Sequence, residues 1–402
     1  MIDYEPTAPE TDPAVYRELR ERCPVHRFDD AGRSIFTLSR YDDVQAMFRS
    51  ASAWSSRYGQ DVWYKDEPGF RNDPPEHTLY RRVLNRTLSA QVVDQHATAV
   101  RTTVAARIDA LPPTGGDLLD DVTGVLPRDL FAPVLGIPEA DGPALWGWTF
   151  DVLAAAEAAD PTRIITWEEQ KARAPWLAAH EYLSPLVAER RAAGPRAGAR
   201  PPAPDLLTAM AEARDDAGAA LPDDAITQAI MLVYFGAVHT TATLLTNALL
   251  RLLDRRELWD RLCADPALAA TVVEESARFD SPVAGIFRTA SATRTVHDVE
   301  IPEDAKVRGL FAAANRDPAV FDDPDTFRLD RELGPLGRQQ LGFGFGVHLC
   351  AGAPFARLEG RIILQELARR KPGLRVPDSS RWWAERVAID LRRPAGLLPS
   401  TW

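Results

Sequence analysis

Cysteine is scarce in this sequence of 402 residues, which contains only Cys23, Cys263 and Cys350. Their odd number and wide separation exclude the framework of a disulfide-stabilised secreted protein and fit a reducing cytosol. The first residues also lack the basic flank and apolar run of a signal peptide. We therefore expect a cytoplasmic protein.

Positive charge is in deficit. Lys and Arg total 47 against 58 Asp and Glu, which gives a net charge of -11. A global charge of this sign argues against a nucleic-acid-binding protein. Hydrophobic residues make up 45% and charged residues 26% of the chain, as in ordinary globular proteins, so the composition does not indicate disorder. We expect one large domain that covers residues 1–402.

Long apolar runs are rare, and only residues 225–250 need to be considered as a membrane span. This segment has no Asp, Glu, Lys or Arg, and a spanning helix takes about 20 apolar residues. It contains the polar residues Gln228, His239, Thr240, Thr241, Thr243, Thr246 and Asn247. These are costly in lipid but tolerable in a helix that crosses a large protein. The segment predicts a long central helix and no membrane span.

The rest of the pattern is mostly helical. Short β-like runs at 25–28 and 35–38 are separated by a turn at 29–32, so a small β-containing part is expected at about 25–40. Helical spacing of apolar residues dominates from Tyr41 onward. Residues 191–204 are rich in Pro, Gly and Arg and predict an exposed, flexible loop.

The strongest functional pattern is F-G-F-G-V-H-L-C-A-G, residues 343–352. Its glycines allow tight turns and close approach to a flat ligand. Cys350 opens an expected helix whose positive N-terminal end favours a thiolate. One face of that helix carries Phe355, Leu358 and Ile362. The alternative is a buried structural cysteine beside a Gly-rich turn, but the spacing favours a ligand.

This segment resembles the cysteine-ligand loop of the cytochrome P-450 enzymes, F-G-x-G-x-H-x-C-x-G, at every specified position. The resemblance implies a single, mainly helical domain with a small β region around a buried haem b. It implies that Cys350 is the ligand of the haem iron, with thiolate donation promoting oxygen chemistry. The neighbouring cofactor-binding residues would be Phe343, Gly344, His348 and Gly352.

The segment D-P-P-E-H-T-L-Y-R, residues 73–81, predicts the start of a helix. Asp73 and Glu76 have the spacing of a capping box, and proline suits a first helical turn. His77 and Arg81 then lie on one helical face.

The resemblance assigns His77, Arg81, Arg288 and His348 to the haem propionates. The alternative for the pair on the helix is a solvated basic face. Solvent exposure is expected for their neighbours Arg82 and Arg86.

Glu275 and Arg278 are three residues apart, so they can form an ion pair on one helix. Taken alone, such a pair is usually solvated at the surface. The resemblance instead implies a buried pair. The family adds an arginine to it, but Thr326 occupies that position here. Arg328 or Arg331 are the candidates to replace the missing arginine.

In the central segment, residues 236–241 resemble the oxygen-activation sequence of the family. Thr240 occupies the threonine position, and Ala237 replaces a glycine near the haem. His239 stands where an acid usually supplies protons. It could relay protons, because the unperturbed pKa of imidazole is about 6.5, or it could only pack.

The implied reaction is O2 activation and insertion of one oxygen atom into a small apolar or aromatic substrate, by hydroxylation or oxidative dealkylation, in specialised metabolism. Catalysis would rest on Thr240 and His239. Alternatives are a haem-thiolate enzyme that uses peroxide or performs oxidative coupling, and a non-catalytic haem sensor. Family position suggests substrate contacts from Trp63, Tyr64, Leu232, Phe235, Val283, Ala284 and Phe287, for which core packing is the alternative.

The sequence shows no flavin or nicotinamide domain, so NAD(P)H electrons would arrive through a ferredoxin reductase and a ferredoxin. We expect a monomer that binds neither nucleic acid nor membrane. An acidic ferredoxin would dock on a local basic patch. The candidates, each of which could also be a simple surface residue, are Arg81, Arg82, Arg86, Arg338, Arg357 and Arg361.

Overall fold

Helices dominate the computed structural model, and the strands among its described residues form one five-stranded sheet and four pairs. The mainly α architecture that the sequence predicts is therefore confirmed. The structure describes residues 2, 4–6, 13–30, 32–60, 62–66, 68–113, 115–154, 164–194, 205–334, 339–376, 385–388, 391–393 and 399–400.

The helices of these ranges differ widely in length. They are α1 (Pro13–Arg22), α2 (Tyr41–Arg49), α3 (Glu76–Leu88), α4 (Ala90–Asp94), α5 (Ala97–Asp109), α6 (Val125–Leu135), α7 (Gly142–Ala154), α8 (Trp167–Lys171), α9 (Ala174–Ala193), α10 (Leu206–Glu212), α11 (Asp223–Asp254), α12 (Arg256–Ala264), α13 (Ala269–Phe279), α14 (Phe311–Ala314) and α15 (Ala353–Arg370).

The strands are short. They are β1 (Val25–Asp30), β2 (Arg33–Leu38), β3 (Trp54–Ser55), β4 (Tyr64–Lys65), β5 (Gly116–Asp117), β6 (Ile164–Ile165), β7 (Ile286–Ala290), β8 (Arg294–Val296), β9 (Val299–Ile301), β10 (Lys306–Gly309), β11 (Glu385–Ala388), β12 (Leu391–Arg393) and β13 (Pro399–Ser400).

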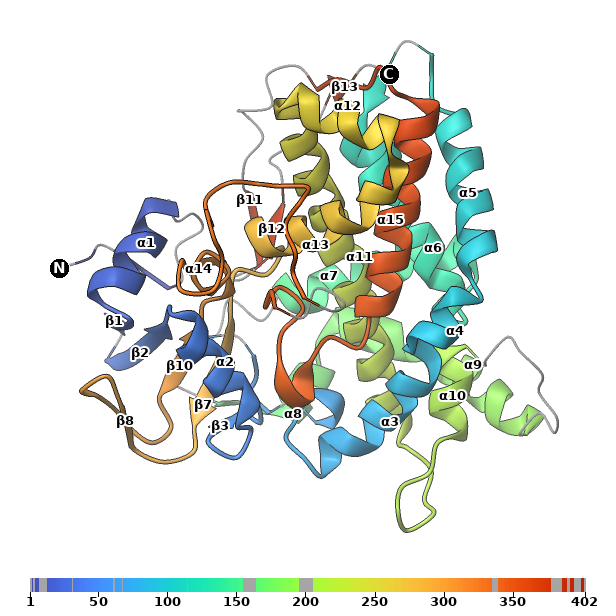
Figure 1. Cartoon of the computed structure of the whole chain (residues 1–402). Coiled ribbons are helices and arrows are strands. Elements are labelled where there is room, and N and C mark those ends of the chain that lie inside the picture. Colours follow the sequence, from blue (N-terminus) through green and yellow to red (C-terminus); the bar gives the residue numbers. More distant parts are fainter. Residues whose placement is uncertain are drawn as a thin grey trace.

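The five-stranded sheet has the order β1-β2-β10-β7-β3. β1 and β2 contain the two short β-like runs that the sequence predicts, and they pair as an antiparallel hairpin with Val25 opposite Leu38. β10 runs parallel to β2 and antiparallel to β7, so late strands join an early hairpin. The sheet lies with α1 and α2 to one side of the helical body (Figure 1). This pairing fixes Arg288, on β7, within the interior.

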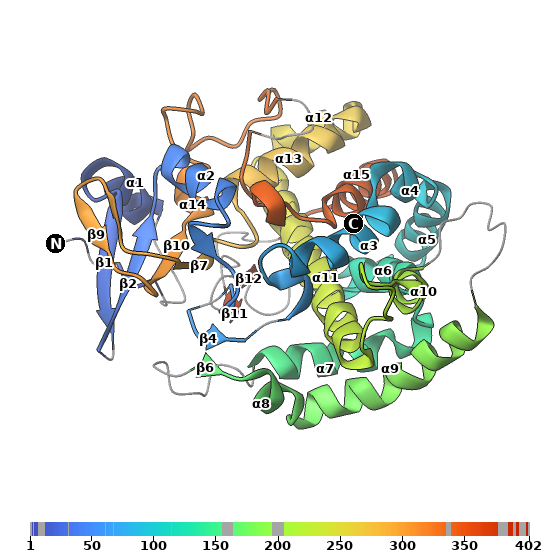
Figure 2. The same cartoon turned by 90° about the horizontal axis from the view of Figure 1, so that it is seen from below.

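Helix α11 is the axis of the helical body. It contacts α6, α7, α9, α13 and α15, and it crosses the molecule between them (Figure 2). By length and composition it could span a membrane, but 67% of its most apolar window is buried inside the protein. The predicted central helix is confirmed, and its apolar character is explained by burial in the core.

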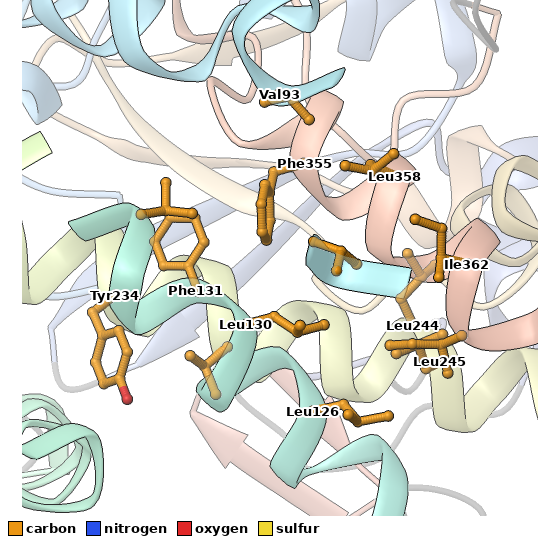
Figure 3. Close-up of a cluster of buried hydrophobic side chains, with 14 of the residues drawn as sticks. Val93, Leu126, Leu130, Phe131, Tyr234, Leu244, Leu245, Phe355, Leu358 and Ile362 are labelled. Carbon is orange, nitrogen blue, oxygen red and sulfur yellow. The ribbon is translucent and has the colours of Figure 1, made fainter. Parts of the chain in front are cut away.

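The main core lies where α4, α6, α11 and α15 meet. Phe355, Leu358 and Ile362 share one face of α15 because residues three and four apart lie above one another on a helix. They pack toward Phe131 of α6 and Leu245 of α11 (Figure 3). This packing holds the helix that follows Cys350 against the central helix.

The predicted loop at 191–204 begins too early. Residues 191–193 continue α9, and Arg191 pairs there with Asp223 at the start of α11. The ion pair explains why the basic end of the helix persists into the Gly- and Pro-rich segment. Residues 195–204 lie outside the described residues.

Candidate functional site

The Gly-rich loop before α15 is closed by the backbone, where the Cys350 N–H donates to the Phe343 carbonyl oxygen over 2.9 Å. Gly344 and Gly346 have φ angles of +75° and +72°, which glycine adopts readily. At Gly346 a Cβ atom would also lie 2.1 Å from the Phe48 carbonyl oxygen. Glycine therefore lets the loop pack on α2 and present Cys350 at the start of α15.

Cys350 ends the Gly-rich loop, shortly before α15 begins at Ala353. Its side chain is solvent-accessible, yet enough protein surrounds the sulfur for burial to raise the pKa of the thiol. Backbone N–H groups of Gly352 and Ala353 act against burial and favour the thiolate, as do the charges of Arg81 and Arg357. A metal cation at the sulfur would complete the deprotonation.

Four basic residues that the sequence assigns to a cofactor come together in the structure. The imidazole rings of His77, on α3, and His348 lie 4.3 Å apart. Burial lowers the pKa of His348 to about 2, and the charges of Arg288, His77 and Arg81 add to this shift. Because the charges of these groups act on one another, β7, α3 and the Gly-rich loop meet at one place. We call the group of His77, Arg81, Arg288 and His348 the basic corner.

Arg288 is the most deeply placed of the four, with 3% of its surface exposed. Its Nη1 donates to the Phe287 carbonyl oxygen over 2.8 Å, and its guanidinium lies over the Phe48 ring. Burial lowers the pKa of Arg288 to about 9, while the charge of Asp73 raises it. A buried arginine is usually matched by negative charge.

These donors fit a haem. At this corner positive groups outnumber the one carboxylate, Asp73, that acts on Arg288 and His77. The two carboxylates of a haem would supply negative charge beside Arg81 and Arg288. Gly352 lies beside the sulfur, where a Cβ atom would be 3.8 Å from Cys350 Sγ, an ordinary van der Waals distance.

The middle of α11 has accessible surface within a largely buried helix. Gly236 is exposed, Ala237 and Thr240 are partly exposed, and His239 and Thr241 are buried. The Thr240 hydroxyl donates to the Gly236 carbonyl oxygen over 2.5 Å. Nothing lies within 4 Å of the position that a Cβ atom would take at Gly236. Small residues thus leave room beside the Thr240 hydroxyl.

His239 packs in a cluster of aromatic rings. Its ring centroid lies 4.0 Å from that of Trp146, on α7, and 5.0 Å from that of Phe235. Trp146 also stacks on Phe235, with ring planes 12° apart. No sequence pattern points to Trp146, because nothing local to α7 indicates which face of α11 it meets.

Glu359 was missed by the sequence interpretation. It is 1% exposed on α15, and burial raises the pKa of its carboxyl well above the ordinary value, against a hydrogen bond with Thr241. Within the described residues its Oε2 has no hydrogen-bond partner. The sequence did indicate its burial. Glu359 is four residues after Phe355 and three before Ile362, so this acid lies on the apolar face of the helix.

The third partner of the Glu275–Arg278 pair is Arg331. Arg278 binds the two Glu275 carboxylate oxygens over 2.7 Å each, and Arg331 Nε lies 3.2 Å from the same carboxylate. Arg328 contributes its backbone N–H, over 3.0 Å, while its guanidinium pairs with Asp330 near the surface. Thr326 accepts through its carbonyl oxygen from both buried arginines. The buried pair is confirmed.

The predicted capping box at the start of α3 is wrong. The helix begins at Glu76 after Pro75, with no side-chain cap. The Asp73 carboxylate is instead bound by Ser55 and Ser56, while Glu76 accepts from the Gly69 N–H and Asn72. Asp73 takes its partners from the segment after β3, and Glu76 takes its partners from the residues just before it, which the spacing alone does not reveal.

The suggested substrate residues occupy different environments. Leu232, Phe235 and Val283 are partly exposed. Ala284 and Phe287 are 2% and 0% exposed within core clusters, where they pack. Trp63 packs beneath Arg33, and the Tyr64 hydroxyl donates to the Asp304 carbonyl oxygen over 2.7 Å.

The suggested docking arginines also differ. Arg82, Arg86 and Arg361 are exposed, as expected for the first two, although Arg82 pairs with Asp216. Arg357 pairs with Glu274 and lies over the Phe343 ring, 4.4 Å from its centroid. Arg338 lies outside the described residues.

Comparisons with known proteins agree on one family. The model of the family described as "Cytochrome P450" matches residues 158–370. The chain is 31% identical to the mycinamicin IV hydroxylase/epoxidase of Micromonospora griseorubida over 405 positions, covering 96% of this chain and 94% of that one. It is 30% identical to the steroid C26-monooxygenase of Mycolicibacterium smegmatis, covering 91% and 87%.

Solved structures match as well. The structure of cytochrome P450 CYP109Q5 from Chondromyces apiculatus has a TM-score of 0.82 and 27% sequence identity, and the match covers 100% of this chain and 98% of that one. The predicted fold is thereby confirmed.

Proposed function

Because the chain belongs to the cytochrome P-450 family, whose named relatives here are monooxygenases and hydroxylases, we propose that it inserts one oxygen atom from O2 into a small apolar or aromatic substrate. The reaction is a hydroxylation or an oxidative dealkylation. The observation that carries this proposal is the position of Cys350, solvent-accessible at the end of the Gly-rich loop, with N–H groups and arginines around its sulfur.

Haem b, the cofactor of the family, supplies the activation of O2 when bound. In the proposal Cys350 is its one protein ligand. His77, Arg81, Arg288 and His348 bind its carboxylates, supported by their grouping at one corner. Ala237, Phe343, Gly344 and Gly352 would complete the set of residues that hold the haem.

Thr240 holds a proton at Oγ1 beside the open surface of α11, where Gly236 leaves space. His239 either relays protons to this region or serves only to pack against Trp146. Leu232, Phe235 and Val283 contact the substrate, because they are apolar and partly exposed. The burial of Ala284 and Phe287 favours packing roles for them instead.

The remaining parts of the proposal concern electron supply and location. The chain acts as a soluble, cytoplasmic, single-domain monomer, without nucleic acid or membrane. Electrons from NAD(P)H reach it through a ferredoxin reductase and a ferredoxin. The exposed Arg82, Arg86 and Arg361 form part of the docking surface, and attraction to an acidic carrier would weaken with salt.

The test of iron ligation uses the carbon monoxide complex of the reduced protein. The parent should show the red-shifted Soret band of thiolate ligation, and Cys350→Ser should lose it. Cys263→Ser is the matched control and should keep it, because Cys263 lies on α12, away from the Gly-rich loop. Retention of the band in Cys350→Ser would reject the assignment.

The substrate is best sought with a ligand panel. Spectral shifts that report displacement of iron-bound water would identify binders, and NAD(P)H with ferredoxin and its reductase would then reveal products. Because relatives are named for a steroid, for erythromycin and for mycinamicin IV, such compounds belong in the panel beside small aromatics. Failure of every binder to yield an oxygenated product would contradict the proposed reaction.

A second candidate is a peroxide-driven reaction on the same centre. It is favoured by the packing of His239 against Trp146 at the position where the family has an acid. Product yield per electron consumed separates the two reactions. If the enzyme uses O2, His239→Asp should retain turnover, His239→Ala should slow it, and Thr240→Ala should divert electrons to peroxide. Unchanged turnover of His239→Ala across about pH 6 to 8, with peroxide-supported activity in the parent, would favour this second candidate.

A further inference from the structure

A buried serine joins three distant segments beside the basic corner. Ser56, fully buried after β3, places its backbone N–H 2.9 Å and its hydroxyl 3.0 Å from Asp73 Oδ1. The same hydroxyl lies 2.8 Å from His348 Nε2. Asp73 precedes α3, and His348 is 292 residues from Ser56 along the chain. The serine therefore lies between a carboxylate and an imidazole.

The chemistry of the three groups places the serine proton. A carboxylate only accepts hydrogen bonds and is the strongest acceptor here, so the Ser56 O–H donates to Asp73. The same hydroxyl oxygen meets His348 Nε2, and the donor and acceptor roles in that contact depend on the tautomer of the ring. Ser55 donates to the other oxygen, Asp73 Oδ2, so both carboxylate oxygens are bound.

We infer that Ser56 and Asp73 are positioning residues that hold the His348 imidazole in one orientation toward the carboxylate-binding corner. This inference rests on the proposed haem site. With Nε2 held by Ser56, rotation of the ring about its attachment to the chain would break a buried hydrogen bond. The ring stays close to His77, with centroids 4.3 Å apart, and beside the buried Arg288. Partners of this kind commonly orient histidines at metal sites, and their loss weakens binding about 10–100-fold.

Ser55 provides a matched control. Its hydroxyl binds the same carboxylate as Ser56 but no described contact joins it to His348. Ser55→Ala and Ser56→Ala each remove one hydroxyl from Asp73, and only the second releases the imidazole. A general loosening of this loop should therefore appear in both variants, whereas loss of His348 orientation should appear in Ser56→Ala alone.

The experiment measures transfer of haem to excess apomyoglobin and the reduction potential of the ferric protein. Ser56→Ala should lose haem about 10-fold faster than the parent and change the potential, while Ser55→Ala should resemble the parent. In a double-mutant cycle, Ser56→Ala should add nothing once His348→Ala is present. Equal effects of the two serine variants, or a full effect of Ser56→Ala in the His348→Ala background, would overturn the inference.

A second variant covers the case in which Ser56→Ala does not fold. Asp73→Asn keeps the size of the side chain but makes its oxygen a weaker acceptor, so haem loss should accelerate in the same direction. Unchanged haem loss and potential in Asp73→Asn would count against the inference. Failure of the proposed function looks different, because the parent itself would then show no thiolate-type carbon monoxide spectrum.

Discussion

Two buried glutamates, one on α13 and one on α15, are almost equally inaccessible but have opposite surroundings. Glu275 is 0% exposed and meets the guanidinium groups of Arg278 and Arg331. Glu359 is 1% exposed and has a hydrogen bond with the Thr241 hydroxyl. No cation contributes to the raised pKa of Glu359.

The comparison shows that burial alone does not decide what a carboxyl group does. Taking a carboxylate out of water costs several kcal/mol unless fixed cations and hydrogen bonds replace the water. Around Glu275 these partners join α13 to the segment of residues 322–331, and the group acts as an ionic connection. Around Glu359 no cation contributes and the Thr241 hydrogen bond does not offset burial, so the raised pKa favours the protonated carboxyl next to α11.

The largest expected effect comes from removing the main cation of the first region. Arg278→Met should lower the free energy of unfolding by about 3–5 kcal/mol, because Glu275 would remain buried with incomplete compensation. Chemical denaturation of the haem-loaded protein measures this change. A loss below about 1 kcal/mol would mean that the pair behaves like one at the surface.

Arg331→Ala should have a smaller effect, a loss of about 1.5–3 kcal/mol, because Arg278 continues to bind both oxygens of Glu275. Arg328→Ala is the matched control. Its guanidinium pairs with Asp330 near the surface, so its loss should cost at most about 1 kcal/mol. If the two variants lose equal stability, Arg331 is not the functional third partner.

The contribution of the second region, around Glu359, to the free energy of unfolding should depend on pH. Because the pKa of Glu359 is raised in the folded protein, the unfolded chain ionises first as the pH rises, and stability falls from about pH 4.3 upward until the folded pKa is reached. Glu359→Gln cannot ionise, so it should gain stability relative to the parent by at most about 1.4 kcal/mol per pH unit in this window. Denaturation at pH 5 and 8 measures the difference. A gain that is the same at both values would contradict a protonated Glu359.

The smallest effect should come from Thr241→Val. The hydroxyl of Thr241 favours the charged form of Glu359, so its removal should raise the pKa of Glu359 further. The free energy of unfolding should change by about 1 kcal/mol. Infrared spectroscopy in H2O and D2O should show the protonated carboxyl band of Glu359 moving to higher frequency in the variant and disappearing in Glu359→Gln. An unmoved band would mean that Thr241 does not contact this group.

Sequence patterns predicted much of the fold and identified the main residues of the candidate site. The hairpin at 25–38 and the helix at 223–254 were visible because alternation and helical spacing are local properties. Arg288, His77 and His348 were selected by resemblance to a family, and the structure brings them together. The same reasoning did not decide whether Arg328 or Arg331 joins the Glu275–Arg278 pair. It also wrongly assigned Asp73 to a capping box at the start of α3.

The sequence by itself determined the Gly-rich loop, the helix after Cys350 and the central helix, because backbone freedom at glycine and apolar periodicity act over a few residues. Only the tertiary structure decided which polar groups meet: Asp73 with Ser56, Arg331 with Glu275, and Glu359 with Thr241. The physical reason is that a buried polar side chain takes the partner that packing brings within about 3 Å. That partner often comes from a segment far away in the chain.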